Sequence, residues 1–403
     1  MKRFAALLTA LCATLLTVTS CDWFSPREKD RQVLLIYFAG NNSLTQEGQG
    51  DFEDLRGAWL PGQKETDKIV LVYHHFMDRT PTLVRLSRDK KGVLVEETIQ
   101  EYPFSTNSAT QETLTTVLND AEEAWPATRR SLILWSHATG YLPAGYYSDP
   151  KDQEPKGPVQ WSVPGNTLEN DPYAHIVKSF AEDHGTEMEL ADLRSALSSR
   201  HYEFVLFDCC FMADVEVAYE LRNVCDYVLF SPTEILSDGF PYETMVQPVF
   251  TQKPEEAMRT IAQNFMAHYR AMSGVYCSAT VSVVRTAGLE PLAAACRPIF
   301  QNHRDQILTI NRSSIQAYHR FSNQYWYYDL DDFVGRVASD AEYAAFLSAL
   351  NGAVIFKDAT DSFLGLTIRH YSGLGSYIPR PSYTVLNNYY KTLQWNKATG
   401  LVQ

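Results

Sequence analysis

Two short, mostly apolar runs end in side chains that could carry out nucleophilic chemistry. Residues 204–207 read Phe-Val-Leu-Phe and are followed by an aspartate and two cysteines, Cys209 and Cys210, while residues 131–135 lead to His137. Because the carboxyl ends of parallel strands meet at one edge of a sheet, a thiol and an imidazole would come together there. A neighbouring imidazole raises the thiolate fraction of a cysteine, so the pair predicts a reactive cysteine.

The elements that must position these groups alternate between strands and helices. Residues 33–38 and 69–73 read as buried strands, and residues 44–58 have helical spacing, with Asn42 or Ser43 as its predicted cap. Such alternation predicts right-handed βαβ units and a mostly parallel sheet. The other predicted elements are helices over 108–124, 189–199, 211–221 and 254–272, strands over 227–230 and 275–284, and an antiparallel hairpin over 82–98.

The chain divides into unequal parts after a short charged tether at 21–30. Residues 31–285 carry the alternating pattern and form the predicted catalytic domain, and residues 286–403 form a C-terminal subdomain packed on it. Residues 141–188 interrupt this alternation with several prolines, among them Pro143, Pro150, Pro155, Pro158 and Pro164, and show no sustained apolar period. A loop this long inside a compact domain is usually functional or disordered.

The residues around the two strand ends resemble the clostripain family of cysteine peptidases, which are relatives of the caspases. The histidine segment reads His-x-x-Gly at 137–140, and the cysteine segment reads Asp-x-Cys-x-Met at 208–212. The resemblance covers most of the chain from about residue 32, and it continues through 216–221, 237–242, 327–330 and 389–393.

The resemblance implies a caspase-like α/β fold, in which a mostly parallel sheet has helices on both faces and a C-terminal α+β extension. It assigns the nucleophile to Cys210 rather than Cys209. It also makes His137 the partner that protonates the leaving amine, in a dyad that forms a thioester acyl-enzyme. The backbone N–H groups of Ala138 and Cys210 would form the oxyanion hole, although the family typically has glycine at the position of Ala138, and a positive φ there would strain alanine.

Two acidic residues are candidates for binding a basic substrate side chain. Clostripain-like enzymes cut after arginine or lysine, and Asp208 resembles the acid at the base of that pocket, where a carboxylate would pair with a guanidinium. Asp208 could instead cap the helix that follows it. Asp238, in Ser-Asp-Gly, is either a second pocket acid or a turn residue, and Thr233 and Glu234 would line the same cleft.

Family members are cut between the histidine and the cysteine to give the active enzyme. Lys151 and Lys156 lie in the corresponding loop and are candidates for self-cleavage, whereas the alternative is an insertion that stays intact. Calcium enters by family analogy alone, because the chain has no Asp-x-[Asp/Asn]-x-[Asp/Asn]-Gly loop. The zinc-binding patterns Cys-x-x-Cys and His-Glu-x-x-His are also missing from the sequence, and no cofactor is required by the predicted chemistry.

The first 20 residues have the layout of a secretory signal. Lys2 and Arg3 precede an apolar run from 4 to 18 that is too short to span a bilayer, and small residues then precede Cys21. This arrangement resembles a bacterial lipobox, which would make Cys21 the acylated first residue of a lipoprotein in the cell envelope, anchored to the outer membrane. An ordinary signal peptide with an incidental cysteine is the alternative.

The amino-acid composition and net charge limit the kinds of molecule that the protein would bind. The chain has 403 residues, 45% of them hydrophobic, and a net charge of −13, so it is a packed protein that would bind nucleic acid poorly. We expect a monomer that acts on proteins or peptides with a basic P1 residue. Two other classes compete: an inactive, surface-anchored binding lipoprotein, which Ala138 favours, and a thiol–disulfide oxidoreductase built on Cys209 and Cys210, whose adjacency disfavours it.

Overall fold

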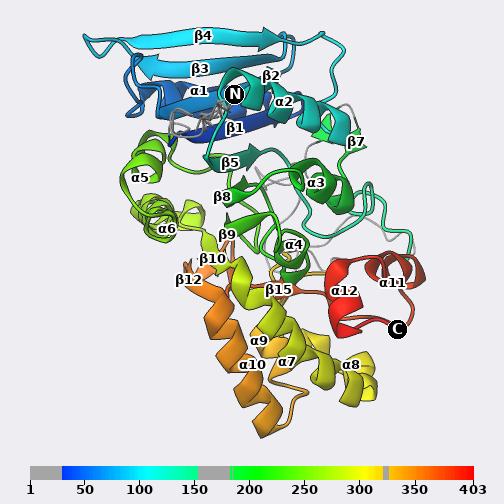
Figure 1. Cartoon of the computed structure of the whole chain (residues 1–403). Helices are drawn as coiled ribbons and strands as arrows, with labels where there is room; N and C mark the ends of the chain where they lie inside the picture. Colours follow the sequence, from blue (N-terminus) through cyan, green and yellow to red (C-terminus); the bar gives the residue numbers. More distant parts are fainter. Residues whose placement is uncertain (1–29, 153–181, 184, 321–325) are drawn as a thin grey trace, which may run out of the picture.

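One large mixed sheet organises the chain. The computed structural model describes residues 30–152, 182–183, 185–320 and 326–403. Nine strands lie in the order β12-β10-β9-β8-β5-β1-β2-β3-β4 (Figure 1). Their bounds are β1 Gln32–Gly40, β2 Lys68–Phe76, β3 Thr82–Arg88, β4 Leu94–Glu101, β5 Arg129–Trp135, β8 Tyr202–Asp208, β9 Cys225–Phe230, β10 Thr280–Arg285 and β12 Val354–Ala359.

The centre of this sheet is parallel and its edges are antiparallel. β1 pairs in parallel with β2 and β5, and β8 pairs in parallel with β5 and β9. β3 and β4 extend one edge, and β10 and β12 extend the other, all in antiparallel pairing. β1 is buried at every position, as expected for the apolar central strand of a sheet covered on both faces. The predicted mostly parallel α/β sheet is therefore confirmed.

Helices cover both faces of the sheet. Leu34 and Ile36 of β1 point to a core shared with α1, α5 and α6, whereas Leu35 and Tyr37 point to a core shared with α2, α3, α4, α7 and α10. The helix bounds are α1 Thr45–Gly57, α2 Gln111–Ala124, α3 Leu190–Leu197, α4 Val215–Glu220, α5 Val246–Thr251, α6 Pro254–Ala271, α7 Leu289–Asn302, α8 Arg304–Thr309, α9 Leu330–Val334, α10 Asp340–Ala353, α11 Thr384–Tyr390 and α12 Gln394–Thr399.

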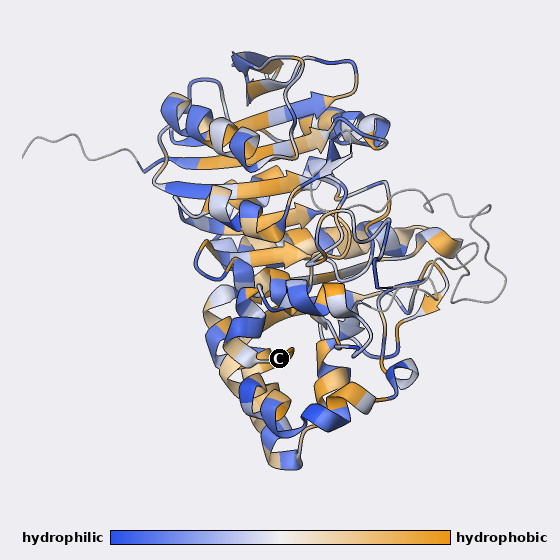
Figure 2. Cartoon of the chain, turned by 90° about the vertical axis from the view of Figure 1, so that its right-hand side faces the viewer, coloured by the Kyte–Doolittle hydropathy of each residue, from blue (hydrophilic) through white to orange (hydrophobic). Residues whose placement is uncertain are grey.

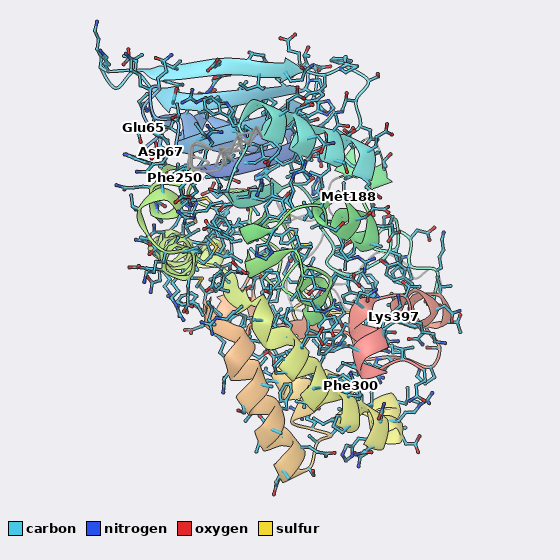
Figure 3. All side chains as sticks on the ribbon, in the orientation of Figure 1. Glu65, Asp67, Met188, Phe250, Phe300 and Lys397 are labelled. Carbon is cyan, nitrogen blue, oxygen red and sulfur yellow. The ribbon has the colours of Figure 1, made fainter. Side chains whose placement is uncertain are left out.

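The figures show how this apolar material is layered. Figure 2 shows the hydrophobic colour concentrated along the strands, with hydrophilic residues on the outer turns of the helices. Figure 3 labels Phe250 on the α5 side of the sheet, and Met188 and Phe300 on the side of α3 and α7. The strand ends that carry the predicted chemistry lie between these two layers.

The C-terminal part shares both the sheet and the core. β12 pairs with β10, so the main sheet continues past residue 285, and the core on the α7 side includes residues up to Val402.

None of the helices in the described part of the chain is long and apolar enough to cross a bilayer. The remaining short strands are β6 Glu182–Asp183, β7 Thr186–Glu187, β11 Tyr328–Asp329, β13 Ser362–Phe363, β14 Leu366–Thr367 and β15 Gly375–Ser376.

Three local predictions were wrong. The helix predicted over 211–221 begins only at Val215, because Phe211 has a φ of 57° and cannot continue a right-handed helix. The strand predicted from residue 275 begins at Thr280, after a 3₁₀ turn. α1 has no side-chain cap, because the Ser43 hydroxyl turns instead toward a histidine.

Candidate active site

The register of the central strands brings the predicted histidine and cysteine to the same edge of the sheet. Trp135, the last residue of β5, pairs with Asp208, the last residue of β8. His137 and Cys210 each follow two residues beyond this pair. The two segments therefore leave neighbouring parallel strands at the same level, as the sequence predicted for these two residues.

The Cys210 thiol is held in a buried and electronegative position. The residue is 6% exposed, and the Ile235 N–H donates to its sulfur at 3.4 Å. Burial, followed by the negative charge of Glu234, raises the pKa of the Cys210 thiol to about 12, while the charge of Arg320 acts in the opposite direction. In this state the sulfur is a neutral thiol, so reaction with a carbonyl requires a base that removes its proton.

Cys209 faces a different environment. Its thiol donates to the Leu134 carbonyl at 3.2 Å, and burial raises its pKa well above the usual range. All five cysteines in the described residues are free, with Cys209 and Cys210 unpaired despite their adjacency. Cys209 therefore behaves as a packed thiol, and the oxidoreductase alternative gains no support.

His137 is fully buried, and its partner was not anticipated from the sequence. The imidazole Nε2 lies 3.0 Å from the hydroxyl oxygen of Ser43, in the turn after β1. Ser43 was predicted only as a possible helix cap. Nothing in the spacing of the motif residues indicates this contact, because β1 and β5 are neighbours in the sheet but about 100 residues apart in the sequence.

Two unusual backbone conformations shape the turns after the histidine and the cysteine. Gly140 has a φ of 63° and Phe211 a φ of 57°. A Cβ on Gly140 would lie 2.5 Å from the Phe211 carbonyl oxygen, so only glycine allows the two turns to approach this closely. Tyr327 braces them, since its ring stacks on Phe211 at 4.4 Å and its hydroxyl donates to the Thr139 carbonyl at 2.7 Å.

The two predicted oxyanion-hole residues lie on these turns. Ala138 is fully buried and is not among the residues with positive φ, so alanine is not strained at this position. Within the part of the chain that the structure describes, neither the Ala138 N–H nor the Cys210 N–H donates a hydrogen bond to another group. Two unsatisfied amides beside a thiol are suited to binding a developing oxyanion.

Asp208 lies beneath the site rather than in an open pocket. It is 4% exposed, and its Oδ2 accepts a hydrogen bond from the Phe240 N–H at 3.1 Å. The alternative that Asp208 caps the following helix was wrong, because Asp214 occupies the N-cap of α4. A Cβ on Gly239 would lie 2.9 Å from Asp208 Oδ2 and 3.1 Å from Asp51 Oδ2, so this turn covers two buried acids.

The Asp51 and Asp208 carboxyl groups form a repulsive pair in the folded protein. Burial raises the pKa of both, and the charge of Asp208 raises that of Asp51 further. The folded state then binds more protons than the unfolded state, so stability falls as pH rises above about 4.

We expect Asp51→Asn to raise the free energy of unfolding by about 1–2 kcal/mol at pH 8 and by less at pH 5. An amide oxygen can still accept from Trp135 Nε1, which donates to Asp51 Oδ2 at 2.7 Å. Urea unfolding at the two pH values measures the difference. An equal or smaller gain at pH 8 would contradict the repulsion.

Asp238, unlike Asp208, lines an open cavity. Its side chain is 60% exposed and lies 3.3 Å from His268 Nε2. The cavity has a volume of about 400 Å³, and its other lining residues are Leu236, Met272, Ser273 and Tyr276. One lining residue, Leu236, directly follows Ile235, whose backbone N–H donates to the Cys210 sulfur.

Glu234 does not line this cavity, because it is engaged in a buried ion pair. Arg320 Nη2 donates to Glu234 Oε1 at 2.7 Å, and Arg320 Nε donates to Oε2 at 2.5 Å. Arg320 is fully buried and Glu234 nearly so. Thr233 is also buried and donates to the Glu234 carbonyl at 2.9 Å. Thr233 and Glu234 are therefore buried and not accessible to a ligand in this structure.

Of the two predicted processing residues, the structure describes one. Lys151 is exposed and pairs with Asp149. The next residue, Asp152, is anchored, since its carboxylate accepts from the Val385 N–H at 2.8 Å and the Leu386 N–H at 2.7 Å at the start of α11. Lys156 lies outside the described residues, as does the predicted lipidation residue Cys21.

Calcium was expected only by analogy with the family. They contain no group of three or more His, Cys, Asp or Glu side chains arranged to hold a metal ion. The nearest approach is Asp214 and Glu216, two fully buried carboxyl groups, where both oxygens of Asp214 lack a hydrogen-bond partner within the described part of the chain. Burial raises the pKa of both groups, and two carboxyls fall short of the six to eight oxygens that calcium takes.

Comparisons with known proteins agree with this arrangement. No curated protein matches the chain. An inactive zymogen C11 protease from Parabacteroides distasonis is 31% identical, with a TM-score of 0.74 over 91% of this chain and 97% of that one. A secreted C11 cysteine protease from Bacteroides thetaiotaomicron, solved with an irreversible peptide inhibitor, is 26% identical, with the same TM-score over 91% and 98%. The profile of the clostripain family matches residues 36–153 and 159–397, and the chain therefore belongs to this family of C11 cysteine proteases.

Proposed function

We propose that the protein is an endopeptidase that cleaves peptide bonds after arginine or lysine, with Cys210 as nucleophile and His137 as general acid and base. The observation that carries this proposal is the cavity of about 400 Å³ that is lined by the exposed Asp238 carboxylate and by Leu236, the residue after the Ile235 that contacts the Cys210 sulfur. Its apolar lining, Met272 and Tyr276, suits the aliphatic stem of a basic side chain, and the carboxylate suits the charged end.

The proposed reaction uses four groups: the Cys210 thiol, the His137 imidazole and two backbone N–H groups. His137 takes the proton of the Cys210 thiol, and the thiolate attacks the substrate carbonyl carbon. The Ala138 and Cys210 N–H groups stabilise the oxyanion. As the C–N bond breaks, the His137 imidazolium gives its proton to the leaving amine, which leaves a thioester. Water, deprotonated by His137, then attacks the thioester to release the acid product and regenerate the thiol.

The test is hydrolysis of fluorogenic peptides with Arg, Lys, Asn or Leu at P1 by residues 22–403 under reducing conditions, with Asp238→Asn and Cys210→Ala alongside. We expect cleavage only after Arg and Lys, and a loss in kcat/KM of about 10- to 100-fold in Asp238→Asn, because one charge-assisted contact is removed. Cys210→Ala is the blank. Cleavage after Asn or Leu that is unaffected in Asp238→Asn would reject the basic pocket and keep the peptidase.

Two further parts of the proposal concern the form in which the enzyme works. We propose that the exposed Lys151, or Lys156, is a self-cleavage site, and that Cys21 carries the lipid that anchors the protein to the outer membrane. The secreted relative from Bacteroides thetaiotaomicron supports export from the cytoplasm. The competing proposal of an inactive binding lipoprotein loses its main support, since Ala138 is not strained.

A further inference from the structure

The contact between Ser43 and His137 joins two loops at the same edge of the sheet. Ser43 Oγ lies 3.0 Å from His137 Nε2, in the turn between β1 and α1. The Ser43 side chain is exposed, whereas His137 is fully buried, so this hydroxyl lies at the solvent side of the imidazole. A serine that capped the helix would accept from the helix backbone, whereas α1 begins without a side-chain cap and the Leu44 N–H before it donates to Asn42 Oδ1 at 2.9 Å.

The turn that carries Ser43 is fixed by buried contacts. The Asn42 side-chain amide donates to the Ala39 carbonyl at 3.1 Å and to the Glu182 carbonyl at 2.8 Å. These two bonds tie the turn to the end of β1 and to β6, so they hold the backbone of Ser43, the next residue, in place.

A second layer of contacts holds the same turn from β2 and the short β6 strand. Asn41 Nδ2 donates to Asp183 Oδ1 at 2.8 Å, and Asp183 Oδ2 accepts from the Ser108 N–H at 2.7 Å. His75 Nδ1, at the end of β2, lies 2.7 Å from the Ser108 hydroxyl and 3.4 Å from Asp183 Oδ2. Asp183 is fully buried, and its two carboxylate oxygens accept hydrogen bonds from Asn41 Nδ2 and from the Ser108 N–H.

From this geometry we infer that Ser43 is a positioning residue for His137, an inference that rests on the proposed Cys210–His137 chemistry. The hydroxyl oxygen accepts a hydrogen bond from the Nε2–H of the imidazole, which fixes the plane of the ring and the tautomer. Ser43 then remains an acceptor when both ring nitrogens carry protons, and so stabilises the imidazolium that forms with the thiolate.

The test compares Ser43→Ala, Ser43→Thr and Thr45→Ala with the wild type in steady-state hydrolysis of an Arg or Lys peptide between pH 5 and 10. Ser43→Thr keeps the hydroxyl. Thr45→Ala removes a nearby hydroxyl without touching His137, because among the described residues Thr45 Oγ1 bonds only to the Gly40 carbonyl and the Met77 N–H. Thermal unfolding of each variant checks that it is folded, and the exposed position of Ser43 predicts a normal midpoint.

For Ser43→Ala we expect kcat to fall about 10- to 100-fold with KM changed less than about threefold, since a hydrogen bond to a charged group is lost. We also expect the acid limb of the pH profile of kcat/KM to move to lower pH, because His137 must be neutral to take the thiol proton and its imidazolium, without an acceptor, gives up its proton more readily. Ser43→Thr should restore both, and Thr45→Ala should leave the limb in place.

Two outcomes would overturn the inference: an unchanged kcat and pH profile in Ser43→Ala, or an equal displacement of the acid limb in Thr45→Ala. Either leaves the proposed function standing as long as the wild type cleaves and Cys210→Ala does not. If the wild type itself cleaves no peptide, the proposed function fails and the inference that rests on it falls as well, whereas failure of the inference alone leaves an active wild type.

Discussion

Arg320→Met is expected to lower the free energy of unfolding by about 3–5 kcal/mol, because it leaves the Glu234 carboxylate buried without its partner. The guanidinium donates to both oxygens of Glu234, and both side chains are almost completely shielded from water. Urea unfolding measures the change. The double variant Arg320→Met/Glu234→Leu should recover most of the loss, because it removes the unpaired charge as well as the pair.

The matched control for this prediction is an exposed pair with the same two-bond geometry. Arg270 donates to both oxygens of Asp358 at 2.6 Å, and its side chain is 48% exposed. Arg270→Met should cost less than about 1 kcal/mol, since water replaces the lost partner. Similar losses in Arg270→Met and Arg320→Met would contradict the role assigned to burial.

The same substitution should also slow chemistry at the thiol. The charge of Glu234 raises the pKa of Cys210, and the charge of Arg320 opposes it. Without Arg320 the thiolate is less stable, so alkylation by iodoacetamide at a given pH should be slower in Arg320→Met than in the wild type, and the double variant should reverse this effect.

Gly140→Ala is expected to lower the free energy of unfolding by about 2–5 kcal/mol, since left-handed backbone strain adds to overpacking. Gly140 has a φ of 63°, and an added Cβ would lie 2.4 Å from Asp214 Oδ2 and 2.5 Å from the Phe211 carbonyl oxygen. The clash separates the turns that follow His137 and Cys210. A displacement of about 1 Å between reacting groups can cost about 100-fold in rate, so peptide hydrolysis should fall even where the variant folds.

Gly145 provides the control for backbone strain alone. Its φ is 73°, but nothing lies within 4 Å of an added Cβ. Gly145→Ala should therefore cost about 1–2 kcal/mol and leave hydrolysis close to that of the wild type. Calorimetry or urea unfolding, together with peptide hydrolysis, separates the two variants. Equal losses of activity in both would mean that the approach of the two turns is not what Gly140 provides.

The sequence was sufficient to predict that the central strands bring the segments of His137 and Cys210 to the same edge of the sheet. Apolar strands of five to nine residues that alternate with helices define a parallel sheet, and parallel strands share an edge for their carboxyl ends, so the meeting of the His137 and Cys210 segments follows from pattern alone. The family resemblance then added the choice of Cys210 over Cys209, which the structure makes reasonable because Cys209 bonds to the Leu134 carbonyl.

Contacts between distant loops could not be predicted in this way. The sequence suggested that Asp208 is a pocket acid or a helix cap. In the structure it is buried near Asp51 of α1, whose pKa it raises, and Asp51 belongs to no recognisable motif. Ser43 read as a cap and lies on His137 instead. Both contacts depend on which loops pack over the end of a strand. The spacing of hydrophobic residues predicts helices and strands, but it does not predict how loops pack.

The strand order has a consequence for a chain that is cut between Lys151 and Glu182. The upstream fragment holds β5 and the downstream fragment holds β8, and these two are paired neighbours from Ser131–Trp135 against Phe204–Asp208 in the middle of the sheet. Pulled apart, each piece would present a bare, hydrophobic inner strand to water, the type of edge that drives aggregation. After such a cut, we expect the two fragments to stay associated through the paired strands β5 and β8, while the cut itself produces only two new chain ends.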